Sequence, residues 1–199
     1  MMSLDDVRAR LQGPVFPTIT PFKEGPGYEV DHEALKDYID FLYDSGARNF
    51  YVMTYNGRFS LLSWKEMMEV NETVARHVKQ KDSDCVVIVA DPMTNPTSVS
   101  IDADVISCIF MERHHHDDQV YDHFKAVADS TNIGILIHEQ LLDSIHGSCL
   151  YPIELLDRLA DIPNVIALKE DSKQPLYTEK VLSAVSDRLS VIISGRGKR

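Results

Sequence analysis

The stretch Val165-Ile-Ala-Leu-Lys-Glu-Asp-Ser172 begins with a short apolar run, and a lysine follows that run directly. Its four apolar residues are continuous rather than alternating with polar ones, which is typical of a parallel strand covered on both faces. Successive side chains of a strand point to opposite faces, so Val165, Ala167 and Lys169 share one face. The stretch therefore predicts a buried parallel strand with a lysine at its end.

Lys169 has two interpretations. At the mouth of a crowded barrel lumen the amine would be partly desolvated, which lowers its pKa and makes a neutral nucleophile available to attack a carbonyl. A lysine just past a strand can instead extend its head group to solvent. From these residues alone the second interpretation describes the commoner case, so the choice depends on the fold around the strand.

The composition is that of a globular protein, with 44% hydrophobic and 26% charged residues among 199. The formal net charge of -11 disfavours a nucleic-acid partner, because binding a phosphate backbone requires a basic face. No apolar run approaches the roughly 20 residues that span a bilayer, and the N-terminus lacks a secretion pattern. Cys85, Cys108 and Cys149 lack metal-ligand spacing and indicate reduced, buried thiols. We therefore expect a cytoplasmic protein with neither a membrane nor a nucleic-acid partner.

Strand and helix signals alternate along the chain. Strands are predicted at 13–22, 49–54, 85–90, 105–110, 133–138, 165–168 and 189–194, and helices at 31–46, 63–78, 118–128, 152–160 and 176–185. Ser63, with Glu66 three residues later, is the signature of a capping box. Strands separated by helices pair in parallel through right-handed crossovers, so a doubly wound sheet and a (β/α)8 TIM barrel both fit.

Two features do not fit a complete barrel. The connection at 91–104 holds two prolines and leaves no room for a crossover helix between the third and fourth strands. The chain also ends just after its seventh strand, without an eighth strand and helix. We expect one incomplete barrel domain over 1–199, with residues omitted near Ile101 and after Arg199, or else a degenerate barrel.

Four stretches carry a resemblance to a known family by their order and spacing. They are Thr18-Ile-Thr-Pro-Phe22, Ser63-x-x-Glu66, Ile162-Pro-Asn-Val-Ile-Ala-Leu-Lys-Glu-Asp-Ser172 and Ile193-Ser-Gly195. Together they resemble the dihydrodipicolinate synthase and N-acetylneuraminate lyase family, the pyruvate-dependent Schiff-base aldolases built on a (β/α)8 barrel. The resemblance covers most of the chain. It implies a barrel fold, a homotetramer, and catalysis without a metal or an organic cofactor.

The resemblance also implies site residues. The family lysine at the position of Lys169 forms an imine with pyruvate, so the resemblance favours the catalytic interpretation of Lys169. His138 stands where the family usually places a proton-shuttling tyrosine. Imidazole exchanges protons near neutral pH more readily than a phenol does, although a histidine hydrogen-bonded in place is the alternative. Ser194 and Gly195 are implied to bind substrate.

The loop that holds the pyruvate carboxylate in the family departs from the family pattern here. It corresponds to Thr54-Tyr-Asn-Gly-Arg58, in which Tyr55 and Asn56 replace two threonines. Asn56 can still donate a hydrogen bond, and Arg58 brings a positive charge. A turn built by Asn56 and Gly57 is the alternative. Tyr55 and Asn56 are thus candidate substrate-binding residues.

Two clusters of polar residues invite a chemical interpretation that we do not adopt. His114-His115-His116 suggests a metal, but consecutive loop residues rarely point to one centre, so we expect a solvated loop and no metal. Glu170 and Asp171 follow the lysine, but Glu170 lies on the opposite strand face from Lys169. We expect both carboxylates to be surface or helix-capping groups.

These observations predict a lyase of the class I aldolase type. Lys169 would form an imine with pyruvate or a related 2-oxo acid, and His138 would move protons with a histidine-like ionisation between about pH 5 and 8. Lys169, His138, Tyr55 and Asn56 should converge at the carboxyl ends of the strands. One alternative is a sugar-acid dehydratase on the same scaffold. The other is a family member that has lost catalysis and only binds a small acid.

Overall fold

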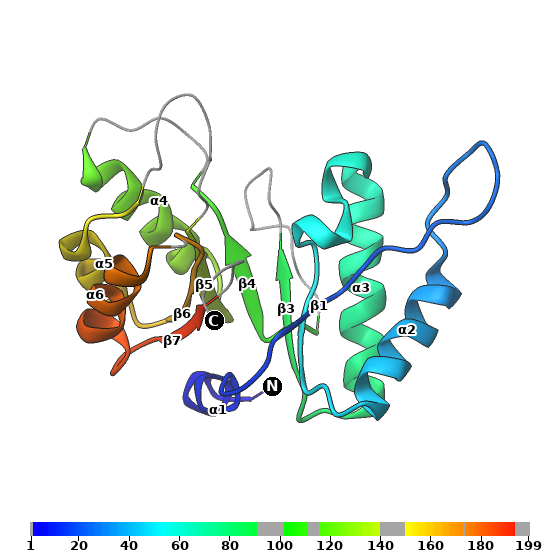
Figure 1. Cartoon of the computed structure of the whole chain (residues 1–199), viewed down its shortest axis with the longest axis horizontal. Helices are drawn as coiled ribbons and strands as arrows, with labels where there is room; N and C mark the ends of the chain where they lie inside the picture. Colours follow the sequence, from blue (N-terminus) through cyan, green and yellow to red (C-terminus); the bar gives the residue numbers. More distant parts are fainter. Residues whose placement is uncertain (1, 91–101, 111–115, 140–149, 173, 194–199) are drawn as a thin grey trace. The chain divides into compact units, whose positions relative to one another are not determined.

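The computed structural model describes residues 2–90, 102–110, 116–139, 150–172 and 174–193, which fall into two compact units, Met1–Ile106 and Ser107–Arg199 (Figure 1). The first unit contains α1 (Leu4–Arg10), β1 (Phe16–Pro17), α2 (His32–Asp44), β2 (Asn49–Tyr51), the 3-10 turns η1 (Tyr55–Gly57) and η2 (Phe59–Leu61), α3 (Trp64–Lys81) and β3 (Val86–Ala90). β4 (Val105–Cys108) crosses the boundary, and the second unit contains α4 (Asp117–Ser130), β5 (Gly134–His138), α5 (Ile153–Ala160), β6 (Val165–Glu170), α6 (Pro175–Val185) and β7 (Ser190–Ile193). The expected single domain over 1–199 stays a prediction.

The predicted alternation of strands and helices is present, and its capping signals act as expected. The Asp31 side chain accepts a hydrogen bond from Ala34 N at 3.1 Å and starts α2. Ser63 and Glu66 form the predicted capping box of α3, with Ser63 N donating to Glu66 Oε2 at 2.8 Å. Both caps satisfy backbone donors that the first turn of a helix leaves without partners.

The N-terminal part differs from the prediction in two places. Ser3 caps an additional helix, α1, by accepting a hydrogen bond from Asp6 N at 3.1 Å. The strand predicted at 13–22 is reduced to the two residues of β1. The reason is its proline content, because each proline removes a backbone donor from the ladder.

Parallel pairing in sequence order is observed within each unit. In the first unit β1 pairs with β2 and β2 with β3, and in the second unit β5 pairs with β6 and β6 with β7. All residues of β3 and β5 are buried, as expected for strands covered on both faces. Helices α2 and α3 pack on one another in the first unit, as α5 and α6 do in the second (Figure 1).

The ladder between β5 and β6 contains a one-residue register shift. Ile135 pairs with Val165, but the next residue of β5, Leu136, pairs with Ala167. Beyond the shift the pairing is regular, and His138 lies directly opposite Lys169. The irregularity therefore sets which two side chains meet at the ends of these strands.

A partly buried ion pair joins α3 to the first unit's sheet. Lys79 Nζ lies 2.7 Å from Asp104 Oδ2 and also donates to the Cys85 carbonyl at 2.7 Å. Asp104 in turn accepts a hydrogen bond from Val87 N at 2.9 Å. Burial raises the pKa of the Cys85 thiol to about 11, so this free cysteine is protonated at neutral pH.

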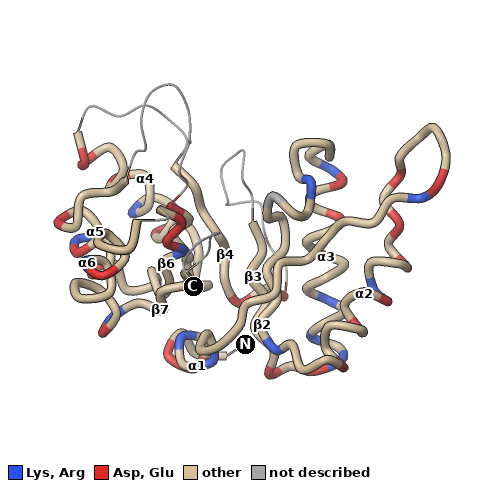
Figure 2. Tube along the Cα trace, viewed as in Figure 1, with Lys and Arg blue, Asp and Glu red and all other residues tan. Residues whose placement is uncertain are grey.

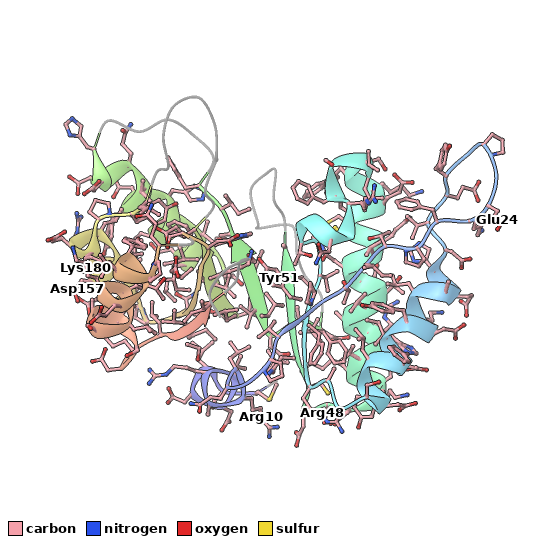
Figure 3. All side chains as sticks on the ribbon, viewed as in Figure 1. Arg10, Glu24, Arg48, Tyr51, Asp157 and Lys180 are labelled. Carbon is pink, nitrogen blue, oxygen red and sulfur yellow. The ribbon has the colours of Figure 1, made fainter. Side chains whose placement is uncertain are left out.

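The surface charges are spread over the helices of both units (Figure 2). Many are paired, as where Arg188 contacts Asp161 at 2.7 Å and also Asp157, which is labelled on α5 in Figure 3. Exposed pairs of this kind contribute at most about 1 kcal/mol each, so the fold is stabilised chiefly by the buried strands. Among the described residues, none of the helices combines the length and the apolar character that crossing a membrane requires.

Residues 91–101 lie outside the described residues. The expected absence of a crossover helix after β3 and the expected break near Ile101 therefore stay predictions.

Candidate functional site

Lys169 and His138 meet at the carboxyl ends of β6 and β5. The Lys169 Nζ atom lies 2.7 Å from His138 Nε2, within hydrogen-bonding distance. Asp171, just beyond β6, places its Oδ2 atom 3.6 Å from the same Nζ atom. The structure thus brings the two residues that we predicted to be catalytic into direct contact, with a carboxylate close by.

Burial controls the ionisation of this pair. His138 is only 3% exposed, and the Lys169 side chain is 12% exposed, so the lysine head group does not extend to solvent. Burial lowers the pKa of Lys169, although the nearby Asp171 opposes this shift. Burial, together with the charge of Lys169, lowers the pKa of His138 to about 3. The imidazole is therefore neutral at pH 7, and its Nε2 atom can accept a hydrogen bond from the lysine.

The ionisation that we predicted for His138 is wrong for the protein without substrate. A histidine with a pKa of about 3 stays neutral from pH 5 to pH 8 and does not titrate there. The cause is that an imidazolium would be buried beside a second cation. A role for His138 as a base is compatible with this neutral state.

The lowered pKa of His138 predicts loss of stability in acid. The group has an ordinary pKa of 6.5 in the unfolded chain and about 3 in the folded one, so below pH 6.5 the unfolded state binds the extra proton. Between pH 6.5 and pH 5 this should reduce the free energy of unfolding by about 2 kcal/mol. Urea unfolding followed by circular dichroism should show that His138→Phe lacks this part of the pH dependence. An unchanged slope in His138→Phe would contradict the assignment.

Two further carboxylates follow the pair in sequence and are buried. Glu139 is 1% exposed and Glu170 is 0% exposed. Of the two expected roles for Glu170, the surface group is wrong, because the strand face opposite Lys169 is covered by α6. The alternative of a group at a helix end agrees better with the structure, since Thr178 in the first turn of α6 donates to Glu170. Asp171 is also not a simple surface group, since it lies beside the lysine amine.

Consecutive residues of α6 bind these two carboxylates. The Tyr177 hydroxyl donates to Glu139 Oε1 at 2.5 Å, and the Thr178 hydroxyl donates to Glu170 Oε2 at 2.6 Å. Burial and the adjacent Glu139 raise the pKa of Tyr177, so this phenol stays protonated. Sequence reasoning missed Glu139, Tyr177 and Thr178, because nothing in a helical pattern shows that two of its residues reach different strands.

The loop predicted to bind the substrate carboxylate belongs to the first unit. Tyr55 and Asn56 lie in η1, where Gly57 N donates to Thr54 O at 2.8 Å, so the alternative of a local turn is realised. The Thr20 hydroxyl fixes this turn by donating to the Gly57 carbonyl at 2.7 Å. Within the described part of the chain the Thr54 hydroxyl is buried without a hydrogen-bond partner. Convergence of Tyr55 and Asn56 with Lys169 stays a prediction.

The remaining candidates lie at or beyond the edges of the described segments. Ser194 and Gly195 fall outside the described residues, as do His114 and His115. His116 begins α4, and its backbone N donates to Gln119 Oε1 at 3.3 Å. Over 2–90 and the other described segments, no group of three or more His, Cys, Asp or Glu side chains is arranged to hold a metal ion.

Comparison with known proteins supports the predicted resemblance. Residues 10–103 match the model of the Dihydrodipicolinate synthetase family. A 4-hydroxy-tetrahydrodipicolinate synthase of Psychrobacter arcticus is 29% identical, over 96% of this chain and 64% of that protein. The crystal structure of dihydrodipicolinate synthase from Aquifex aeolicus has a TM-score of 0.75 at 24% identity, over 92% of this chain and 63% of that one. N-acetylneuraminate lyase from Mycoplasma synoviae has a TM-score of 0.73 at 19% identity, over 90% and 61% of the two chains.

These matches establish the fold and a similarity in sequence to one family. The structural similarity shows that the seven strands and their helices form part of a (β/α)8 barrel, as the sequence predicted. The chain spans less than two thirds of the length of the curated relatives that it matches. The proteins to which it is similar include lyases of two named activities. The predicted resemblance is therefore confirmed: this chain is similar in sequence to members of the Dihydrodipicolinate synthetase family, and similar in fold to dihydrodipicolinate synthase and N-acetylneuraminate lyase.

Proposed function

We propose that this chain carries the Schiff-base centre of a lyase that acts on pyruvate or a related 2-oxo acid. The observation that supports the proposal best is the 2.7 Å contact between Lys169 Nζ and the neutral imidazole of His138. An amine can attack a carbonyl only after losing its proton, and here a buried base lies beside a buried amine. The kinship with lyases supports the same reaction class.

The first steps form the imine. Burial lowers the pKa of Lys169, so its ammonium can lose a proton to solvent, and the neutral amine, hydrogen-bonded to His138 Nε2, attacks the carbonyl carbon of the keto acid. The resulting carbinolamine takes up a proton on its hydroxyl group and loses water, which leaves a protonated imine on Nζ. Asp171, 3.6 Å from Nζ, stabilises the positive charge that persists there.

The imine then activates the neighbouring carbon. Its positive nitrogen withdraws electrons, so a proton leaves the adjacent carbon for His138 and a neutral enamine forms. Because the charge on Nζ is one cause of the low pKa of His138, its loss in the enamine makes the imidazole a better base. The enamine attacks an aldehyde to make a carbon–carbon bond, and the reverse sequence cleaves one.

Other features of the working protein are proposals of wider scope. We propose a cytoplasmic, homo-oligomeric enzyme that needs no metal or organic cofactor. The buried free thiols Cys85 and Cys108 suit a reducing compartment. The oligomer and the absence of a cofactor have the family resemblance as their support.

Borohydride trapping tests the proposed function. Reduction in the presence of pyruvate should fix one pyruvate per chain, and peptide mapping by mass spectrometry should place it on Lys169. Borohydride alone, and borohydride with lactate, should give no adduct because neither can form an imine. Adducts with sugar-derived 2-oxo acids in preference to pyruvate would favour the dehydratase. No adduct with any 2-oxo acid would leave a protein that only binds a small acid.

A further inference from the structure

We propose that the first turn of α6 is a clamp that positions Lys169 and His138 for proton transfer. The clamp is defined here as the Tyr177 and Thr178 hydroxyls together with the carboxylates of Glu139 and Glu170. The inference rests on the proposed function and names residues that take part in it without touching the substrate. These are positioning residues for the imine chemistry.

The clamp follows from the alternation of side chains along a strand. Glu139 comes directly after His138, and Glu170 comes directly after Lys169. Successive side chains point to opposite faces, so when His138 and Lys169 face one another, the two glutamates project to the other side. Both glutamates are buried there, and both are bound by α6.

The two hydrogen bonds of the clamp are short and involve carboxylates. Tyr177 Oη lies 2.5 Å from Glu139 Oε1, and Thr178 Oγ1 lies 2.6 Å from Glu170 Oε2. Hydrogen bonds of this length to a carboxylate are roughly twice as strong as those between neutral groups. Burial excludes the water that would otherwise compete for the same oxygens. Adjacent residues of one helix thus hold the ends of two adjacent strands.

Further hydrogen bonds hold both carboxylates of the clamp in place. Glu139 Oε1 also accepts a hydrogen bond from Tyr151 N at 2.8 Å, and the backbone N of Glu139 donates to the Lys169 carbonyl at 3.2 Å. Glu170 Oε1 accepts from Ser172 N at 2.6 Å. The carboxylates also lie at the N-terminal turn of α6, where the helix dipole favours negative charge. Through the two glutamates, α6 therefore holds the backbone next to both His138 and Lys169.

The functional consequence concerns distance. Proton transfer between Nζ, the bound keto acid and Nε2 requires these atoms to be held at hydrogen-bonding separation, and a displacement of about 1 Å can cost on the order of 10²-fold in rate. Removing a clamp hydroxyl frees the end of one strand without changing the chemistry of either reacting side chain. The clamp should therefore affect proton transfer more than it affects the capacity to form the imine.

Two measurements on the same variants separate these effects. Borohydride trapping at saturating pyruvate reports imine formation at Lys169. Exchange of the pyruvate methyl protons for deuterium in D₂O, followed by NMR, reports proton transfer. The imine gives a methyl proton to the base as the enamine forms, and the enamine takes up a deuteron when the imine is restored. The variants are Tyr177→Phe and Thr178→Val, which remove one hydroxyl each and keep the shape of the side chain.

We expect Tyr177→Phe and Thr178→Val each to slow methyl exchange about tenfold or more, and the double variant to slow it about 10²-fold. The trapping yield should stay at the parent level. Thr178→Ser keeps the hydroxyl and should exchange at the parent rate. Tyr121→Phe, which removes a hydroxyl from α4 beneath Arg158, should also behave like the parent.

Two results would overturn the clamp. One is exchange at the parent rate in the double variant. The other is a joint fall of trapping yield, exchange rate and melting temperature that Thr178→Ser does not rescue, since that pattern describes a merely structural role. If the parent itself traps no pyruvate, the proposed function fails and the clamp fails with it. Trapping in the parent together with unchanged exchange in the double variant would mean that the clamp alone has failed.

Discussion

Replacing Lys169 by methionine should abolish the trapped pyruvate adduct and reduce turnover by at least about 10⁴-fold. Methionine keeps the length and most of the volume of the lysine side chain but cannot form an imine. The substitution removes a buried cation, so the fold should tolerate it: Asp171 keeps access to solvent, and the His138 imidazole is neutral already.

The measurement combines turnover with borohydride trapping, and it has a matched control. Lys180 is an exposed lysine on the same helix as the clamp (labelled in Figure 3), and Lys180→Met should retain both trapping and turnover. Circular dichroism should show parent-like folding for both variants. An adduct that persists in Lys169→Met would mean that another amine carries the chemistry.

Replacing His138 by phenylalanine should lower turnover by on the order of 10²–10⁴-fold, the usual contribution of a positioned acid or base. The imine should still form, because the Lys169 amine remains in its desolvated position and its pKa is lowered mainly by burial. Loss of turnover with retention of the adduct is therefore the expected signature. This result would distinguish the role of His138 as the base from the role of Lys169 as the nucleophile.

The pH profile supplies an independent test of the same residue. Because burial and Lys169 hold the pKa of His138 at about 3, turnover of the parent should not show a histidine-like step between pH 5 and pH 8. His123→Phe is the matched control, since this histidine packs between Phe110 and Phe124 and a phenyl ring preserves that stacking. Full activity in His138→Phe would mean that another residue transfers the protons, and Tyr55 would be the next residue to test.

The sequence was sufficient for most of the secondary structure after the N-terminal part, and for the strand face that carries Lys169 and His138. Continuous apolar runs such as 165–168 and the cap at Ser63 report local physics, so β6 and α3 could be predicted from them. The assignment of Lys169 and Glu170 to opposite faces of the strand was also correct, because alternation along a strand does not depend on tertiary context. Contact of Lys169 with His138 followed from their positions at the ends of neighbouring parallel strands.

The opposite face of the same strands could not be predicted in the same way. Glu170 was correctly assigned to the face away from Lys169, but that face was assumed to meet water, whereas in this fold it meets a helix. The hydrogen bond from Tyr177 to Glu139 joins residues far apart in sequence, and neither residue carries a local signal of its partner. The low pKa of His138 has the same origin, since burial arises from the fold and not from neighbouring residues.

The register shift between β5 and β6 has a consequence for anyone who aligns or redesigns this site. An uninterrupted ladder continued from the pair Ile135 and Val165 would bring His138 opposite Leu168, and not opposite Lys169. An alignment that treats these strands as ideal would therefore misassign the neighbour of the reactive amine by one position. A graft of the pair into another barrel must carry the irregularity with it, because an idealised host would present histidine to leucine and leave the lysine without its base.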